Sequence, residues 1–274
     1  MKIGIFDSGV GGLIIAKAIQ KIMPEYDYVY LGDTQRVPYG VRSHQTVFEF
    51  SREGVDYLFR KENCAIVVIA CNTSSARALR QIQEEYLPKN FPERKVLGVI
   101  IPTIEECVKF KRVGVIGTTG TISSNTFPVE IKKILALRSL GEGGNKKTRV
   151  FQNPAPMLVP LAEEGERVLA KPFIIKYLEP FKSKKINALV LGCTHYPFFK
   201  KEIKKVLGKN IKLISQDEII PKKLKEYLCK HSEIERKLSK NKSAKILVTD
   251  ITKNVEKLSK EWFGKNTKPE LVQL

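Results

Sequence analysis

The amino-acid sequence predicts an α/β protein of two pseudo-symmetric lobes, each with a mainly parallel sheet flanked by helices. Three observations predict this fold class. Short apolar runs alternate with stretches of helical periodicity, which is the pattern of parallel βαβ units. Two of the apolar runs end in similar turns that contain a cysteine. Further pairs of similar segments recur at a nearly constant separation along the chain.

The predicted strands are short apolar runs bounded by turn residues. They cover Lys2–Phe6, Tyr28–Leu31, Ala65–Ala70, Val96–Ile101, Arg112–Ile116, Ala188–Leu191, Ile211–Ile214 and Lys245–Val248. Helical periodicity fills most of the intervals, most clearly Leu13–Met23, Gln45–Lys61, Ser74–Tyr86, Glu163–Tyr177 and Phe198–Leu207. Because helical stretches separate successive strands, we expect the strands of each sheet to run parallel.

Similar segments suggest that the two lobes are related halves. The pairs lie roughly 110 to 120 residues apart, about the length of one domain. They are Ile3–Gly9 with Val113–Thr119, Ile100–Pro102 with Ile219–Pro221, and the two cysteine turns. The two Pro-containing segments would then mark where the chain passes between the lobes. We expect residues 1–98 and 210–274 to form the first lobe and residues 99–209 the second, with the active site between them.

Composition places the chain among soluble globular proteins. It is 42% hydrophobic and 28% charged. No segment approaches the roughly 18 apolar residues of a membrane span. The amino terminus enters a predicted strand without a secretory signal, so we expect a cytoplasmic protein with no membrane contact. The five cysteines are scattered, which argues against a disulfide framework, and we expect Cys64, Cys107 and Cys229 to be small buried hydrophobes.

The strong positive charge raises the question of a nucleic-acid partner. Lys and Arg number 48 against 29 Asp and Glu, which gives a net charge of +19. The basic residues are dispersed, and many fall on amphipathic helical stretches such as Lys222–Lys242. We expect solvated helix faces there and no dedicated nucleic-acid site, because no recognised binding module accompanies the charge.

Two predicted strands each lead into a cysteine among small hydrogen-bonding residues. Ile66–Thr73 contains Cys71, and Ala188–His195 contains Cys193. Amide and hydroxyl donors at a helix amino terminus lower a thiol pKa from about 8.5, so we expect thiolate at neutral pH. Nucleophilic catalysis needs one attacking group and a base. Two equivalent thiols instead fit inversion of a carbon centre, in which one removes a proton and the other delivers one to the opposite face.

Other polar residues have a structural as well as a functional interpretation. Asp7 follows the first strand and would bind a cation or a hydrogen-bond donor, although a helix cap would use the same carboxylate. Its loop, Asp7–Gly12, lacks the Lys of a nucleotide-binding P-loop. His195 could join Cys193 in a metal pair. With three histidines and no Cys-x2-Cys pair in the chain, we expect no metal and interpret His195 as an orienting or proton-sharing neighbour.

A series of motifs extends these observations over nearly the whole chain. They are Asp7–Leu13, Gly32–Thr34, Pro38–Gly40, Ala70–Thr73, Gly117–Thr121, Leu158–Leu161, Leu191–Pro197 and Val248–Asp250. In this order they closely resemble the motifs of bacterial glutamate racemases, within the cofactor-independent aspartate/glutamate racemase superfamily. The segment Ser215–Asp217 departs from the Asp-plus-small-residue pattern often found in that family.

The resemblance implies roles for individual residues. Cys71 would exchange the α-proton of D-glutamate and Cys193 that of L-glutamate, without a cofactor. Asp7, Glu163 and His195 would assist them. Substrate would be bound by Asp7, Ser8, Tyr39, Gly40, Asn72, Thr73, Thr118, Thr121, Thr194 and His195. The resemblance further implies a homodimer that supplies D-glutamate for peptidoglycan synthesis.

The residues alone leave three other functions open. One is a racemase for another acidic amino acid, such as aspartate. The second is a cysteine hydrolase that uses a single thiol as nucleophile. The third is a binding protein that owes its function to the charge of +19. Solvent-deuterium incorporation into L-glutamate and L-aspartate would separate the first from a glutamate racemase. Replacement of one or both cysteines of the turns would separate the other two.

Overall fold

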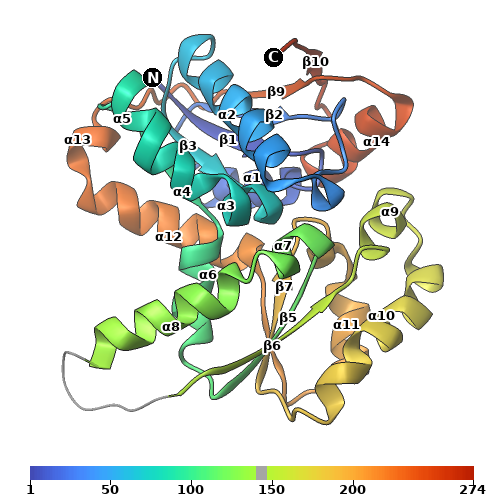
Figure 1. The fold of residues 1–274 in the computed structure, drawn as a ribbon. Coiled ribbons are helices and arrows are strands. Elements are labelled where there is room, and N and C mark those ends of the chain that lie inside the picture. The colour runs from blue at the N-terminus through green and yellow to red at the C-terminus, as the bar shows by residue number, and fades with distance from the viewer. Residues whose placement is uncertain (140–146) are drawn as a thin grey trace.

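The computed structural model describes residues 1–139 and 147–274. Within these residues the strands form two separate sheets, one of six and one of four strands, and every strand pair is parallel. Figure 1 shows the two sheets one above the other, each with helices packed against it. The predicted fold class is confirmed. None of the described helices is both long and apolar enough to cross a lipid bilayer.

The six-stranded sheet is buried on both faces. Its order is β10-β9-β2-β1-β3-β4. The strands are β1 (Lys2–Asp7), β2 (Tyr28–Gly32), β3 (Cys64–Ile69), β4 (Lys95–Gly98), β9 (Ala244–Val248) and β10 (Glu270–Leu271). Ile66 and Val68 of β3 enter one apolar core, whereas Val67 and Ile69 enter the other. Burial on both faces explains why these strands are continuous apolar runs in the sequence.

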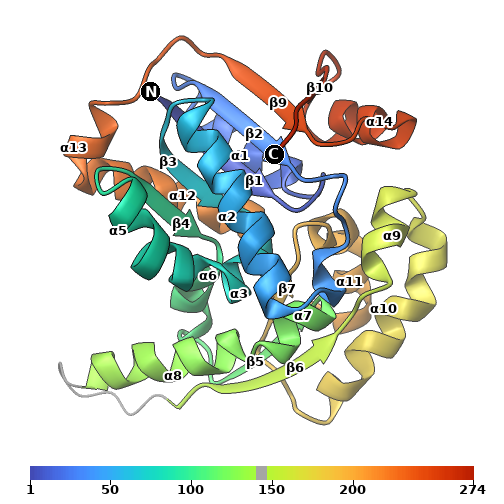
Figure 2. The same cartoon turned by 45° about the horizontal axis from the view of Figure 1, so that its top comes forward.

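Helices cover the two faces of this sheet. They are α1 (Leu13–Ile22), α2 (His44–Arg60), α3 (Asn72–Arg77), α4 (Leu79–Gln81), α5 (Leu87–Asn90), α12 (Gln216–Lys230), α13 (Ser232–Glu235) and α14 (Lys253–Trp262), with a 3-10 turn η1 (Tyr39–Val41) and a π-helical turn η2 (Ile82–Tyr86). Apolar residues of α1, α12 and α14 fill the core on one face, and those of α2, α4 and η2 fill the other. Figure 2 shows α1 and α2 on opposite sides of β1.

The four-stranded sheet has the order β6-β5-β7-β8. Its strands are β5 (Arg112–Gly117), β6 (Arg149–Pro154), β7 (Ala188–Gly192) and β8 (Lys212–Ile214). Its helices are α6 (Ile100–Cys107), α7 (Thr119–Ser123), α8 (Thr126–Ser139), α9 (Leu158–Glu163), α10 (Arg167–Lys182) and α11 (Lys200–Leu207), with the 3-10 turn η3 (Tyr196–Phe199). The helices α9 to α11 pack on one face, and α6 and α8 pack on the other.

The two sheets repeat one strand order. The order β2-β1-β3-β4 in the first sheet corresponds to β6-β5-β7-β8 in the second. The cysteine turns follow β3 and β7, which therefore occupy equivalent places. The helices α6 and α12 follow the equivalent strands β4 and β8 and carry the chain from one sheet to the other. The two Pro-containing segments fall in these helices, since Pro102 lies in α6 and Pro221 in α12.

One predicted lobe boundary and one predicted strand end differ from the structure. The strand β8 belongs to the second sheet, so the chain leaves that sheet after Ile214 and not near Asn210. The strand predicted over Val96–Ile101 ends at Gly98, because the next helix begins at Ile100. Two strands were not predicted. The strand β6 carries polar, partly exposed residues, and β10 is a short, exposed edge, so neither leaves a continuous apolar signal.

The predicted helix Glu163–Tyr177 is two helices. The first ends at Glu163 and the second begins at Arg167, because Gly165 between them has a φ of 77°, which favours glycine. The buried environment expected for Cys229 is also wrong, since this cysteine is exposed on α12. Cys64 and Cys107 are buried, and all five cysteines are free.

Candidate active site

One cavity of about 360 Å³ collects the residues that follow strands of both sheets. Among the residues predicted from the sequence, Ser8, Tyr39, Gly40, Cys71, Asn72, Thr73, Thr118, Glu163, Cys193, Thr194 and His195 line it. Asp7 lies behind the lining and is fully buried. Thr121 is also fully buried and contacts the lining through hydrogen bonds. The cavity therefore has one of the two cysteines from each lobe.

Cys71 caps helix α3, which begins at the next residue. Its sulfur lies 3.2 Å from Oγ of Ser8 and accepts a hydrogen bond from the backbone N–H of Ser74 at 3.5 Å. Burial and the negative charge of Asp7 raise the pKa of the Cys71 thiol to about 11, although the bonds from Ser8 and Ser74 act in the opposite direction. The expected lowering of this thiol pKa is therefore wrong. Cys71 is a neutral thiol at neutral pH.

Asp7 is held behind Cys71 by backbone groups. Its Oδ2 accepts the N–H of Gly9 at 3.2 Å and that of Gly12 at 3.1 Å, just before α1 begins. Its Oδ1 is buried and has no hydrogen-bond partner. Burial raises the pKa of Asp7 above its usual value. The nearby His195 and the two backbone bonds act in the opposite direction but do not outweigh burial. Asp7 thus serves the structural role of an amide acceptor and still has one carboxylate oxygen free.

Cys193 has an imidazole beside its sulfur. Nδ1 of His195 lies 3.7 Å from Sγ, and Nε2 of His195 lies 2.9 Å from Oε1 of Glu163 on α9. Burial by itself lowers the pKa of His195. The hydrogen bonds to Cys193 and Glu163 outweigh burial and raise the pKa to about 10. His195 is consequently an imidazolium at neutral pH, with its positive charge beside the Cys193 sulfur.

The Tyr39 side of the cavity is fixed by a buried carboxylate. Asp33 follows β2 and is fully buried. It accepts hydrogen bonds from the hydroxyl of Tyr39, from Nε of Arg36 at 2.6 Å, and from the hydroxyl of Thr249 at 2.9 Å. Asp33 therefore orients the loop that carries Tyr39 and Gly40 into the lining. Asp33 falls within the Gly32–Thr34 motif, but the sequence assigned it no role.

Hydroxyl groups join the two lobes beside the cysteines. Oγ1 of Thr73 lies 2.8 Å from Oγ1 of Thr118 and 3.3 Å from Oγ1 of Thr121. Thr73 belongs to α3 of the first lobe, whereas Thr118 precedes and Thr121 lies in α7 of the second. Thr118 also caps α7, since its hydroxyl accepts the N–H of Thr121 at 3.2 Å. The cavity is therefore closed on this side by contacts between the lobes.

A glycine permits a second close approach of the lobes. A Cβ atom at Gly11 would lie 2.4 Å from Oγ1 of Thr194 and 2.5 Å from Nδ1 of His195. Any larger residue would push the loop before α1 away from the turn that follows β7. Arg77, at the end of α3, adds bonds from the first lobe to the carbonyl of Gly120 at 3.2 Å and to Oγ of Ser123 at 2.9 Å.

Several residues of the site were not predicted from the sequence. Part of the lining is apolar and comes from Val37, Pro38, Val41, Pro156, Val159 and Pro160. The signal that could have indicated these residues is that most of them lie within or next to the Pro38–Gly40 and Leu158–Leu161 motifs. Trp262 of α14 packs edge-on against His195, with ring centroids 5.6 Å apart. Nothing in the sequence pattern indicated this contact, because α14 and β7 are far apart in the chain.

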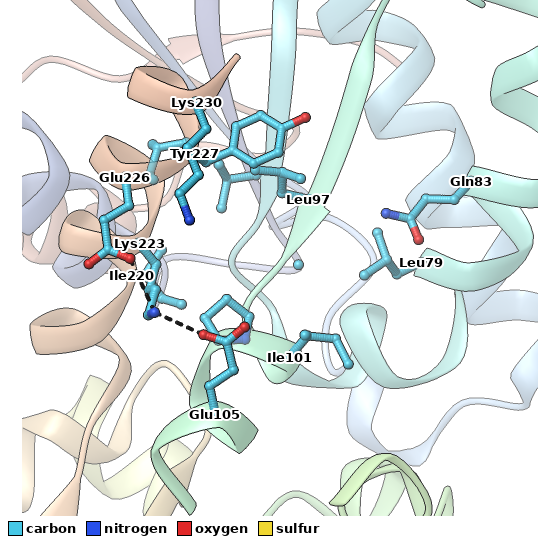
Figure 3. A pocket seen from close by; sticks show the side chains of 14 residues that line it. Leu79, Gln83, Leu97, Ile101, Glu105, Ile220, Lys223, Glu226, Tyr227 and Lys230 are labelled. Atoms are coloured by element: carbon cyan, nitrogen blue, oxygen red, sulfur yellow. Dashed lines mark ion pairs between the residues drawn. The ribbon is translucent and has the colours of Figure 1, made fainter. Parts of the chain in front are cut away.

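The helices α6 and α12, which carry the chain between the lobes, are called the passage helices below. A second cavity, also of about 360 Å³, lies between them and contains neither thiol of the turns. Figure 3 shows Lys223 of α12 directed toward Glu105 of α6 and Glu226 of its own helix. The corresponding ion pairs measure 2.9 and 3.1 Å. In the described part of the chain, no group of three or more His, Cys, Asp or Glu side chains is arranged to hold a metal ion.

Fold and site together define an α/β protein in which two related lobes bind a small molecule between them, each contributing one thiol. The chain belongs to the Asp/Glu/hydantoin racemase family, whose sequence model matches residues 14–216. The glutamate racemase of Aquifex pyrophilus is 40% identical over 100% of this chain and 98% of the relative. That of Aquifex aeolicus is 38% identical over 99% of this chain and 98% of the relative.

Solved structures give the same assignment. The crystal structure of glutamate racemase from Francisella tularensis in complex with D-glutamate is 33% identical to this chain. The likeness covers 99% of this chain and 97% of the other, with a TM-score of 0.85. The agreement therefore extends over both lobes and the cavity between them.

Proposed function

We propose that this chain is a glutamate racemase that interconverts L- and D-glutamate with Cys71 and Cys193 as its two acid/base groups. One observation carries the proposal: the thiols follow equivalent strands of two related sheets and line the same cavity. The choice of glutamate is supported by full-length relatives, 38% and 40% identical, that are named glutamate racemases.

The lining suits an amino acid with two carboxylates. Backbone and side-chain donors of Ser8, Asn72, Thr73 and Thr194 would hold the carboxylates, while Tyr39 and Gly40 bound the far end of the cavity. Asp7, which lies buried behind this lining with its Oδ1 unpartnered, would attract the ammonium group. Together these groups would place the α-carbon between the two sulfurs and stabilise the charge that develops when the α-proton leaves.

The reaction consists of two proton transfers. A thiolate takes the α-proton, so that an S–H bond forms and the Cα–H electron pair passes into the α-carboxylate. The opposite thiol then gives its proton to the other face of the α-carbon and becomes a thiolate. Turnover of L-glutamate begins with Cys193 as thiolate and Cys71 as thiol, and turnover of D-glutamate begins with the reverse arrangement.

The charges around the thiols support this starting state. The neutral Cys71 thiol is a proton donor, and the positive charge of the His195 imidazolium lies beside the sulfur of Cys193. We propose that the two thiols suffice without a cofactor. We further propose, from the family resemblance, a cytoplasmic homodimer that supplies D-glutamate for peptidoglycan synthesis. Sedimentation of the purified protein would test the dimer.

The decisive experiment follows D- and L-glutamate separately by circular dichroism in deuterated water, with no cofactor added and with aspartate in parallel. We expect the signal of each enantiomer of glutamate to fall to zero and deuterium to appear at the α-carbon. Faster turnover of aspartate than of glutamate would show that aspartate is the substrate, while the protein would still be a racemase. Absence of exchange at the α-carbon of both amino acids would overturn the proposal.

A further inference from the structure

The side-chain amide of Asn72 is paired with that of Gln216. Nδ2 of Asn72 donates to Oε1 of Gln216 at 2.7 Å, and Nε2 of Gln216 donates to Oδ1 of Asn72 at 2.7 Å. Both residues are buried, with exposed fractions of 2% and 1%. Asn72 directly follows Cys71 and lines the catalytic cavity, whereas Gln216 is the first residue of α12. A residue of a passage helix therefore holds a residue of the site.

Thr103 determines which positions the amide oxygen and nitrogen of Gln216 and Asn72 occupy. Its hydroxyl donates to the carbonyl of Val99 at 2.6 Å, so its oxygen can only accept from Gln216. Nε2 of Gln216 lies 3.4 Å from that oxygen. If the Gln216 amide turned over, two oxygens would face each other with no proton between them. The position of the Gln216 nitrogen is thereby fixed, and with it the oxygen and nitrogen of Asn72.

We propose that Gln216, oriented by Thr103, is a positioning residue that sets the Asn72 amide so that its remaining N–H faces a carboxylate of the substrate. This inference rests on the proposed function, in which Asn72 binds the amino acid. In the opposite setting, Asn72 would present its carbonyl oxygen to the carboxylate. The hydrogen bond would then be replaced by a repulsive contact between two acceptors.

The same side chains connect the site to both passages between the lobes. Thr103 lies on α6, Gln216 on α12 and Asn72 on α3. The ion pair of Glu105 with Lys223 joins α6 to α12 a second time (Figure 3). The orientation of Asn72 is consequently set by the passages and not only by the lobe that contains it.

Two substitutions at Thr103 test the proposal through enzyme kinetics. Thr103→Val keeps the shape but removes the oxygen, so both settings of the amide pair become accessible. We expect the KM for glutamate to rise severalfold with kcat nearly unchanged, because only a fraction of the molecules has Asn72 in the binding orientation. Thr103→Ser restores the hydroxyl and should restore the KM. Equal KM values in wild type and Thr103→Val would overturn the proposal.

Gln216→Met removes the amide pair while keeping the side-chain length. We expect the KM to rise by about tenfold, the order of one lost hydrogen bond to a charged group. The matched control is Gln20→Met on α1, which should behave as wild type. A fall of kcat together with the melting temperature, at constant KM, would show a merely structural role and overturn the proposal.

A measurement without substrate separates this inference from the proposed function. In nitrogen-15 NMR spectra, the Asn72 side-chain amide proton that is donated to Gln216 should exchange slowly with solvent in wild type and in Thr103→Ser, and rapidly in Gln216→Met. Slow exchange in a protein that does not turn over glutamate would support the amide pair and contradict the proposed function. Rapid exchange in wild type would overturn the inference even if the protein is an active racemase.

Discussion

The two cysteine turns occupy equivalent places but have opposite electrostatic surroundings. Beside Cys71 lie the hydroxyl of Ser8 and the buried carboxylate of Asp7, which is one cause of the raised thiol pKa. Beside Cys193 lies the imidazolium of His195, whose partner is Glu163. The repeated strand order fixes where the sulfurs lie, and the neighbouring side chains give the two sulfurs opposite electrostatic surroundings. A two-base reaction needs this difference, because one group must donate while the other accepts.

The largest effect is expected when either sulfur is replaced. Cys71→Ser and Cys193→Ser should each lower racemisation of both enantiomers by about a thousandfold, because a hydroxyl is a far weaker base than a thiolate. Circular dichroism of D- and L-glutamate turnover measures this loss. Cys229→Ser makes the same change at an exposed position and should have no effect. Full activity in either single variant of the turns would refute the pairing of the two thiols.

An intermediate effect is expected from Glu163→Gln, which alters only the Cys193 side. His195 is protonated below its pKa of about 10, so wild-type kcat/KM should fall as pH rises through that value. Loss of the carboxylate lowers the His195 pKa and moves this fall to lower pH. At a pH between the His195 pKa of the variant and that of wild type, kcat/KM of the variant should be lower by between about tenfold and a hundredfold.

The control for this profile is Glu164→Gln, at the exposed neighbouring position. Because the two enantiomers have equal free energy in solution, kcat/KM must have the same pH dependence in both directions, and either one reports the change. An alkaline limb that stays near pH 10 in Glu163→Gln would show that the Glu163 bond does not govern His195.

The smallest effect is expected from Ser8→Ala, which acts on the Cys71 side and also removes one donor from the cavity lining. The Ser8 hydroxyl stabilises the Cys71 thiolate against the cost of burial, so its loss should raise the Cys71 pKa further. We expect kcat/KM to fall about fivefold, as for one neutral hydrogen bond. Thiol titration of Cys71 in a variant with Cys193 replaced would detect the shift. Ser232→Ala, on the exposed α13, should leave the thiol pKa unchanged.

The sequence predicted the elements with strong local signals. Buried parallel strands are continuous apolar runs, and the turns after β3 and β7 brought Cys71 and Cys193 to the correct edge. The resemblance added Tyr39 and Glu163, whose positions no local pattern could indicate. The strand β6 was missed because its exposed polar residues carry no apolar periodicity.

Contacts between distant segments could not be predicted. The pairing of Asn72 with Gln216 joins residues 144 positions apart, and the contact of His195 with Trp262 joins two lobes. The protonation of Cys71 was also predicted wrongly. Helix position favours a thiolate, but burial and Asp7 dominate, and both depend on packing that only the folded chain reveals.

The connectivity of the two lobes sets the order in which their sheets can be completed. The second lobe is a continuous segment inserted into the first, and all four of its strands precede Gln216 in the chain. In the first sheet, by contrast, β2 pairs with β1 on one side and with β9 on the other. The β9 side stays unpaired until β9 is synthesised, since Tyr28 pairs with Ala244. Such long-range parallel pairing is slow compared with local contacts. On the ribosome the lobe that contains Cys193 can therefore form first, and the lobe that contains Cys71 completes its sheet last.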